Sequence, residues 1–266
     1  DTIDYIESVS MITKIGVLIP STSNQRPWKT VDESYLYKST LKTFLLTHDK
    51  EHQYVFYIGI DRNDPIYDNE DNQRKLIRLC SICTHISLKF IYMDNITKGH
   101  LTVMWNRLFE QAYNDDCDYF YQCGDDIEFH TKGWVNDSID VLQKHDNQGV
   151  TGPISNNSRI ITQTFVSRKH MEWFGYYFPP EIINWCCDDW INMVYYKMKL
   201  LFPLTQHYGN NIGGTPRYNI NNETNMTDSN LSLRINQLRN FADSLANKQV
   251  EKIKKDGLLN KTTGIV

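Results

Sequence analysis

The feature that most constrains this chain is the alternation of short apolar runs with amphipathic stretches in its first half. Apolar runs of strand length occur at 14–20, 54–60, 87–93 and 117–123. Stretches with apolar residues at helical spacing separate them, at 32–46, 73–83 and 98–113. This alternation predicts an α/β fold with a mainly parallel sheet flanked by helices. Ligands bind beyond the carboxyl ends of such strands, so we expect the loops after the four strands to share one functional edge.

The second half of the chain is less regular. A strand is predicted over 162–167, and an acidic pair precedes a helical run within 179–199. The region 209–228 is dense in Gly, Asn, Pro and Thr, which is typical of a loop or linker.

A last helix is predicted over about 229–255. Its apolar residues follow a 4-3-4-3 spacing at Leu231, Ile235, Leu238, Ala242 and Leu245. Two heptads are too few for a coiled coil, so a helix packed on its own domain is favoured over one that forms a homo-oligomer. We therefore divide the chain into a main domain, 1–215, and an Asn-rich linker with a C-terminal helix, 216–266.

Charge and hydropathy exclude two classes of partner. The 266 residues contain 28 Lys and Arg against 32 Asp and Glu, a net charge of −4. A slightly acidic chain is a poor partner for a phosphate backbone, so nucleic acid is not expected. No apolar run is long enough to span a membrane, and 1–11 lacks the apolar core of a signal peptide, so we expect a cytoplasmic protein.

The six cysteines do not form a recognisable framework. Cys80 and Cys83 make one CxxC, but the second pair that a zinc site needs is missing, and Cys186 and Cys187 are adjacent. Buried free thiols are therefore favoured over a structural zinc. Most histidines show no convergent spacing: His48, His52, His85, His100, His130, His145 and His170.

The sharpest local signal is Gly124-Asp125-Asp126 at the end of an apolar strand. Two adjacent carboxylates repel each other unless a positive group lies nearby. Mg²⁺ and Mn²⁺ bind carboxylate oxygens and keep substrate phosphates among their other ligands. A solvated acidic turn is the alternative, but the place of the pair on the predicted functional edge favours a metal–diphosphate site.

Several segments together resemble nucleotide-sugar-dependent glycosyltransferases of the GT-A fold, nearest to the family-2-like group. GVLIPSTS resembles the first strand and its nucleotide-contacting loop, which implies contacts from Pro20, Ser21 and Thr22. IDRNDP and TKGHLTVMWNRLFEQA resemble further donor-binding segments, with Asp61, Gly99 and Asn106 in the matching places. DYFYQCGDDIEF is similar to the strand and DxD segment of the family, which implies that Asp126 reaches the metal and that Asp125 contributes to donor binding. The chain departs from that pattern at Gly124, where the family has an acidic residue.

Two later segments extend the resemblance to about residue 207. CCDDWINMVYY is similar to the segment that heads the acceptor-side helix, which places Asp188 and Asp189 where the catalytic base would lie, with Asp189 favoured. An inverting transfer needs such a carboxylate to take the proton of the acceptor hydroxyl. His207, followed closely by glycine, resembles a further metal ligand of many GT-A enzymes. A helix-terminal charge pair and a structural histidine are the alternatives.

The resemblance implies a metal-dependent transferase. It would move a sugar from a nucleoside-diphosphate sugar, with UDP favoured, to a hydroxyl of a glycan, protein or small molecule, with inversion and with Mn²⁺ or Mg²⁺. Two alternatives stay open. A non-catalytic module that binds a sugar nucleotide or glycan would explain Gly124, and a metal-dependent phosphoryl hydrolase would use both acidic pairs but lacks the expected paired histidines.

Overall fold

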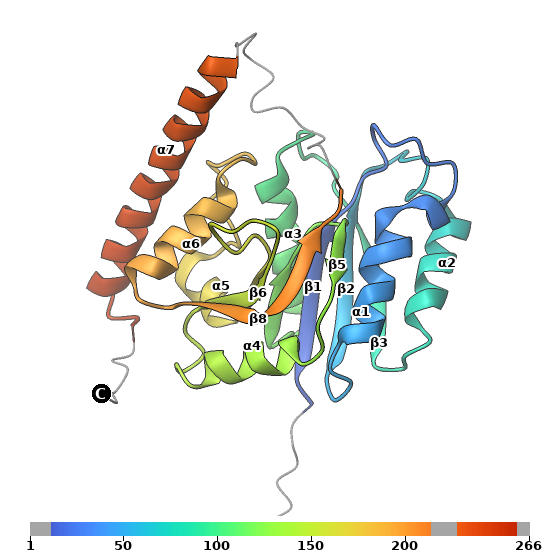
Figure 1. Cartoon of the computed structure of the whole chain (residues 1–266), viewed down its shortest axis with the longest axis horizontal. Coiled ribbons are helices and arrows are strands. Elements are labelled where there is room, and N and C mark those ends of the chain that lie inside the picture. The colour runs from blue at the N-terminus through green and yellow to red at the C-terminus, as the bar shows by residue number, and fades with distance from the viewer. Residues whose placement is uncertain (1–11, 214–227, 260–266) are drawn as a thin grey trace, which may run out of the picture.

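The structure is a computed structural model that describes residues 12–213 and 228–259. Its centre is an eight-stranded sheet of order β3-β2-β1-β4-β7-β6-β8-β5 (Figure 1). The strands are β1 (Lys14–Pro20), β2 (Gln53–Ile60), β3 (Ile86–Tyr92), β4 (Tyr119–Gln122), β5 (Ile127–Phe129), β6 (Val150–Ile154), β7 (Thr164–Ser167) and β8 (Leu201–Asn211).

The first half of the sheet is parallel. β1 pairs with β2 and β4, and β2 pairs with β3, all in the same direction. Strands covered on both faces need near-continuous apolar sequence, and β1 is buried from Ile15 to Ile19. The carboxyl ends of these four strands therefore share one edge, as predicted, and the α/β fold class is confirmed.

The second half of the sheet is mixed. β7 runs antiparallel to β4 and β6, β8 runs parallel to β6, and β5 runs antiparallel to β8. Only the strand at 162–167 was predicted in this half. β8 was not predicted from the sequence, because it contains no continuous apolar run. Its buried residues, such as Leu204 and His207, are separated by exposed polar residues.

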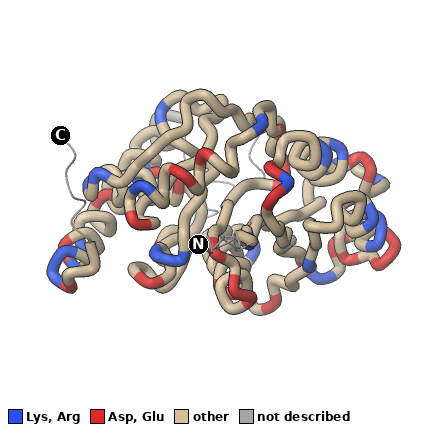
Figure 2. The backbone as a smooth tube through the Cα atoms, turned by 90° about the horizontal axis from the view of Figure 1, so that it is seen from below, with Lys and Arg blue, Asp and Glu red and all other residues tan. Residues whose placement is uncertain are grey.

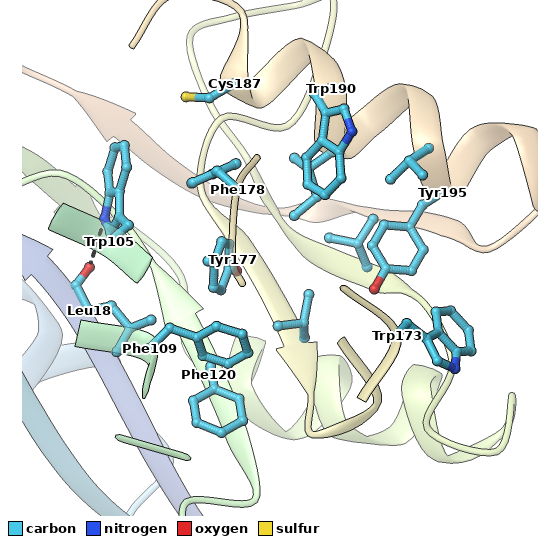
Figure 3. Packing of buried hydrophobic residues seen from close by; sticks show 14 of the residues in the cluster. Leu18, Trp105, Phe109, Phe120, Trp173, Tyr177, Phe178, Cys187, Trp190 and Tyr195 are labelled. Carbon is cyan, nitrogen blue, oxygen red and sulfur yellow. Dashed lines mark hydrogen bonds between the residues drawn. The ribbon is translucent and has the colours of Figure 1, made fainter. Parts of the chain in front are cut away.

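Helices cover both faces of the sheet. One apolar layer joins the sheet to α1 (Lys42–Thr47), α2 (Glu70–Cys80) and α4 (Trp134–Gln143). The other joins it to α3 (Leu101–Asn114), α5 (Lys169–Phe174), α6 (Cys187–Lys197) and α7 (Asp228–Lys255). Figure 3 shows aromatic side chains of the second layer, in which the indole N–H of Trp105 donates to the carbonyl of Leu18 at 3.3 Å.

The helix predicted over 32–46 is divided into three pieces. A short 3₁₀ turn, η1 (Val31–Glu33), is followed by a π-helical segment, η2 (Leu36–Leu41), and then by α1. Thr40, within η2, is buried, and its Oγ1 lies 2.9 Å from the carbonyl oxygens of both Asp125 and Ile127. π-helical turns often occur at functional sites, and this one braces the acidic turn after β4.

The C-terminal helix α7 packs along α6 (Figure 1). Four apolar side chains of α7 are buried: Ala242, Ala246, Val250 and Ile253. Gln249 accepts the indole N–H of Trp190 at 2.7 Å, and Asp243 pairs with Lys197 at 2.8 Å. The helix thus contributes to the core of its own chain. Most of the predicted linker lies outside the described residues, and the division at 215 stays a prediction.

Two features concern partners. Among the described residues no helix is both long and apolar enough to cross a membrane. Figure 2 shows acidic and basic positions interspersed along the backbone, as the small net charge suggests.

Candidate functional site

The loop after β1 is tied to the loop after β2. Asp64 is buried, and its carboxylate accepts the backbone N–H of Ser23 at 2.8 Å and the hydroxyl of Ser23 at 2.6 Å. The same carboxylate accepts the N–H groups of Ile66 and Tyr67, at 3.0 and 2.9 Å. Asp64 therefore fixes the shape of both loops. Its place in IDRNDP was visible in the sequence, but its role was not.

Of the predicted donor-binding residues, Pro20 ends β1, and Ser21 and Thr22 lie on this fixed loop. The backbone N–H of Ser21 donates to the carbonyl of Gly59 at 2.8 Å, which continues the β1–β2 pairing by one residue. Its hydroxyl is buried and makes no hydrogen bond within the part of the chain that the structure describes. A buried hydroxyl in this state is costly unless a ligand satisfies it.

Asp61 and Gly99 lie at the ends of two neighbouring connections on this edge. Burial raises the pKa of Asp61, while the nearby Lys98 opposes the rise. Gly99 has a φ of +83°, a left-handed conformation that glycine adopts without strain, and begins the turn into α3. Its carbonyl accepts the side-chain amide of Asn184 at 3.0 Å. This contact joins the start of α3 to the segment that precedes α6.

Asn106 also faces that segment. Its Oδ1 accepts the backbone N–H groups of Tyr177 and Phe178, at 3.0 and 2.9 Å, and its Nδ2 donates to the carbonyl of Phe178 at 2.8 Å. These three bonds anchor the chain after α5 to α3. The contact with the nucleotide stays a prediction, but the geometry supports an anchoring role for Asn106.

The pair after β4 is divided between the interior and the edge. Asp125 is 1% exposed, whereas Asp126 is part-exposed. The carbonyl of Asp126 accepts the backbone N–H of Ile212 at 2.9 Å, so the turn continues the pairing of β5 with β8. The sequence placed these two residues together but could not tell which would face outward.

Glycines lie on both sides of the Asp126 carboxylate. A Cβ added at Gly124 would lie 2.6 Å from Asp126 Oδ1, and one added at Gly213 would lie 1.8 Å from Oδ2. Any side chain at either position would collide with the carboxylate in its present place. Gly124, which departs from the family pattern, therefore gives Asp126 its room here. Arg26 also reaches this corner, where its guanidinium donates to the carbonyl of Gly213 at 3.2 Å.

His207 lies at the other end of β5. Its ring nitrogens lie 2.9 Å from Thr131 Oγ1 and 2.7 Å from Asp137 Oδ2, near the start of α4. It precedes Ile212, the neighbour of Asp126, by five residues, which is about 16 Å of extended chain. The structure therefore does not bring His207 together with Asp126. A histidine held by a hydroxyl and a carboxylate fits the structural alternative.

The second acidic pair heads α6 and is divided in a different way. Asp189 is 4% exposed, and its Oδ1 contacts Arg159 at 2.5 Å and Arg239, from α7, at 3.0 Å. Asp188 is part-exposed, and its Oδ1 accepts the backbone N–H of Asp189 at 3.0 Å. Burial, followed by the adjacent charge of Asp189, raises the pKa of Asp188 to about 6. Asp189 is thus held by two guanidinium groups, and Asp188 is the carboxyl whose pKa is raised.

One loop connects the two pairs. Residues 155–163 join β6 to β7, and both Asn156 and Gln163 bond to Asn211, which precedes the partner of Asp126. Further along the same loop Arg159 pairs with Asp189, and the N–H of Ile161 donates to Asn192 of α6 at 3.2 Å. The two acidic pairs therefore border a shared region of the functional edge. No sequence pattern links Arg159 to Asp189, because 30 residues separate them.

The aromatic residues near the second pair are mostly core. Trp173, Tyr177, Phe178 and Trp190 are buried within the layer drawn in Figure 3. Phe174, Tyr176 and Trp185 keep some exposed surface.

No model of a known protein family and no curated protein matches the sequence. Solved structures of S. aureus TarS do match. Residues 1–349 of TarS in complex with UDP give a TM-score of 0.53 at 10% identity, over 95% of this chain and 74% of that one. The complex with UDP-GlcNAc gives 0.53 at 13% identity, over 86% and 73%. Another TarS structure gives 0.50 at 14% identity, over 74% of this chain and 36% of that one.

The chain therefore spans about a third of that longer TarS chain. At this level of identity the likeness concerns the fold. It supports, at a coarse level, the GT-A-like architecture that the sequence motifs implied.

Proposed function

We propose that the chain is a glycosyltransferase that uses a nucleoside-diphosphate sugar. One observation carries the proposal: two acidic pairs border one region of the sheet edge, and in each pair one residue, Asp126 or Asp188, keeps some exposed surface. The fold supports it, because TarS, a glycosyltransferase with this fold, has been solved with UDP and with UDP-GlcNAc. We propose a uridine nucleotide as the carrier on the same ground.

Asp126 is the residue that we assign to the donor. Its carboxylate, flanked by Gly124 and Gly213, fits a site for Mg²⁺ or Mn²⁺, which needs only one or two protein carboxylates beside the substrate phosphates. A bound cation of this kind would act as a Lewis acid that stabilises the charge on the departing diphosphate. His207 is too far along β8 to join it. Ser21, Asp61 and the start of α3 at Gly99 would complete the donor site.

Asp188 is the residue that we assign to proton transfer. In an inverting transfer the acceptor oxygen attacks the anomeric carbon, the bond from that carbon to the diphosphate breaks, and a carboxylate accepts the hydroxyl proton. A carboxylate with a pKa of about 6 is mostly ionised at neutral pH and still basic enough for this task. Asp189, which the sequence favoured, is engaged by Arg159 and Arg239, so we give it a positioning role.

The non-catalytic alternative is weakened by Gly124. The sequence alone allowed the missing acidic residue to mean a degenerate site. In the structure this glycine is what permits the Asp126 carboxylate to lie where it does. Binding of a sugar nucleotide without turnover remains the outcome that would support a binding module.

A panel of nucleotide sugars with Mn²⁺, scored for released nucleotide, tests the proposal. A glycosyltransferase releases the nucleoside diphosphate from one donor, and EDTA or Asp126→Ala stops the release. A nucleoside monophosphate with a sugar phosphate would indicate a phosphoryl hydrolase. Calorimetric binding of a donor with no release from any member of the panel would contradict the enzymatic assignment.

A further inference from the structure

A second group of metal-ligating side chains lies at the opposite edge of the sheet. His48 ends α1, and Cys83 and His85 lie in the turn between α2 and β3. The carbonyl of His85 accepts the backbone N–H of Tyr54 at 2.9 Å, which places the group where β2 and β3 begin. The candidate donor site lies where these strands end. This combination was not predicted from the sequence, because 35 residues separate His48 from Cys83.

The three side chains converge closely. One ligand atom from each, two imidazole nitrogens and the Cys83 sulfur, lie within 4.8 Å of one another. The Nε2 atoms of His48 and His85 are 2.7 Å apart. With bond lengths of about 2.0 Å to nitrogen and 2.3 Å to sulfur, tetrahedral Zn²⁺ places two such nitrogens about 3.3 Å apart and a nitrogen and sulfur about 3.6 Å apart. Binding would change the nitrogen–nitrogen distance by about 0.6 Å and each nitrogen–sulfur distance by at most about 1.2 Å.

The ring of His48 is held in place by hydrogen bonds at Nδ1, the nitrogen that faces away from His85. Its Nδ1 lies 3.1 Å from the carbonyl oxygens of both Phe44 and Leu45, so Nδ1 must carry the proton, since carbonyls only accept. The lone pair of its Nε2 then points at the Nε2 of His85. Metal-bound histidines are typically held by such a bond from the other ring nitrogen. Burial lowers the pKa of both rings, which favours the neutral form that coordinates metals.

We propose that His48, Cys83 and His85 bind one Zn²⁺ ion, with solvent as the fourth ligand. Two imidazoles and a thiolate suit this borderline-soft ion and do not suit Mg²⁺, which prefers oxygen. The Cys83 S–H bond breaks on binding, the sulfur bonds to zinc and the proton leaves to solvent. Lys50 and Glu51 are the nearby charged groups, of opposite sign.

Zinc at this place would fasten the end of α1 to the α2–β3 turn. α1 follows directly on η2, whose Thr40 braces the acidic turn at the far edge. A zinc ion here would thus act on the packing of α1, and the proposal does not depend on the proposed transferase activity.

Titration of the whole reduced protein with Co²⁺ tests the proposal. Co²⁺ in a tetrahedral site with a thiolate gives a near-ultraviolet charge-transfer band and visible d–d bands. We expect both to saturate at one equivalent and to disappear on addition of Zn²⁺. Their absence from the unaltered protein would overturn the proposal without any variant.

Three variants assign the ligands. Cys83→Ser should remove the charge-transfer band, and His85→Asn should weaken Zn²⁺ binding by more than the roughly 10- to 100-fold that a lost supporting partner costs. Cys80→Ala is the matched control. Cys80 is in the same CxxC, but burial raises its pKa to about 12, so its loss should leave the spectrum unchanged. Circular dichroism checks that each variant is folded, and a thiolate band that survives in folded Cys83→Ser would overturn the assignment.

Discussion

The two acidic pairs of the candidate site are built alike in sequence and differently in space. In the first pair Asp125 is buried and Asp126 is part-exposed. In the second pair Asp188 is part-exposed, and Asp189 is buried and paired with two arginines. The first pair is divided by backbone geometry, since its turn is braced by Thr40 and bordered by Gly124 and Gly213. The second is divided by charge, through two arginines. Adjacent carboxylates can thus be given separate tasks by either means.

The pairs also differ in what supports them. The turn at Asp125 is held by η2 and the end of β8, within the sheet domain. Asp189 is held partly by Arg239, on the C-terminal helix. The comparison predicts that the first pair is sensitive to added side-chain volume at the flanking glycines. The second pair should be sensitive to loss of charge, including charge on α7.

Removal of the donor-side carboxylate should have the largest effect. Asp126→Ala takes away the oxygen ligands of the proposed cation, so nucleotide release from the donor should fall to background. Glu128→Gln, two residues further along on β5, removes a charge outside the site and should retain most of the activity. Equal loss in both variants would indicate a general effect of charge on this edge.

The second-largest effect is expected from a methyl group added beside Asp126. Gly213→Ala would place a Cβ 1.8 Å from Asp126 Oδ2, so the carboxylate must move and donor turnover should fall by about 10²-fold or more. Gly209→Ala is the matched control, because its Cβ would meet its nearest neighbour at 3.7 Å, an ordinary contact. Similar rates for the two variants would show that the position of this carboxylate does not matter.

On the acceptor side, Asp188→Asn should reduce transfer by about 10²- to 10⁴-fold, because an amide cannot take the acceptor proton. Asp189→Asn should act differently. It leaves the proposed base in place but loosens the arginine clamp, so its main effect should be on stability. A larger loss of transfer in Asp189→Asn than in Asp188→Asn, with both proteins folded, would return the base to Asp189.

The pH dependence sharpens the same assignment. The base must be deprotonated to act, so kcat/KM should be constant above a pH of about 6 and fall tenfold per unit below it, following the raised pKa of Asp188. This is measured as initial rates of nucleotide release at saturating Mn²⁺. A rate that stays level down to pH 5 would contradict a base with this pKa.

The smallest effect is expected at the helix. Arg239→Gln removes one of the two guanidinium groups on Asp189 and should lower the free energy of unfolding by about 1 kcal/mol, because Arg239 is partly exposed and Arg159 remains. Lys248→Gln changes an exposed charge on the same helix and should lower it by much less. Urea denaturation of the two variants measures the difference.

Prediction from the sequence succeeded where one stretch of chain decides the outcome. The strands at Lys14–Pro20 and Gln53–Ile60 and the helix at Leu101–Asn114 carry their own apolar patterns, and the acidic pairs could be placed at element ends. It missed what depends on distant partners. The role of Gly213 is apparent only from its contact with Asp126. That of His48 is apparent only from its closeness to Cys83 and His85. A shared metal site of His207 and Asp126 was expected from the sequence because β8, whose register sets the distance between them, was not predicted.

Calorimetric titration of UDP in the presence of Mn²⁺ tests the central claim, the division of work between the two pairs, most directly. We predict that Asp126→Ala loses metal-dependent UDP binding, because the cation links this carboxylate to the diphosphate. Asp188→Asn should bind UDP as the unaltered protein does, because its carboxylate is needed only when the acceptor proton leaves. Unchanged binding in Asp126→Ala, or loss of binding in a folded Asp188→Asn, would contradict the account.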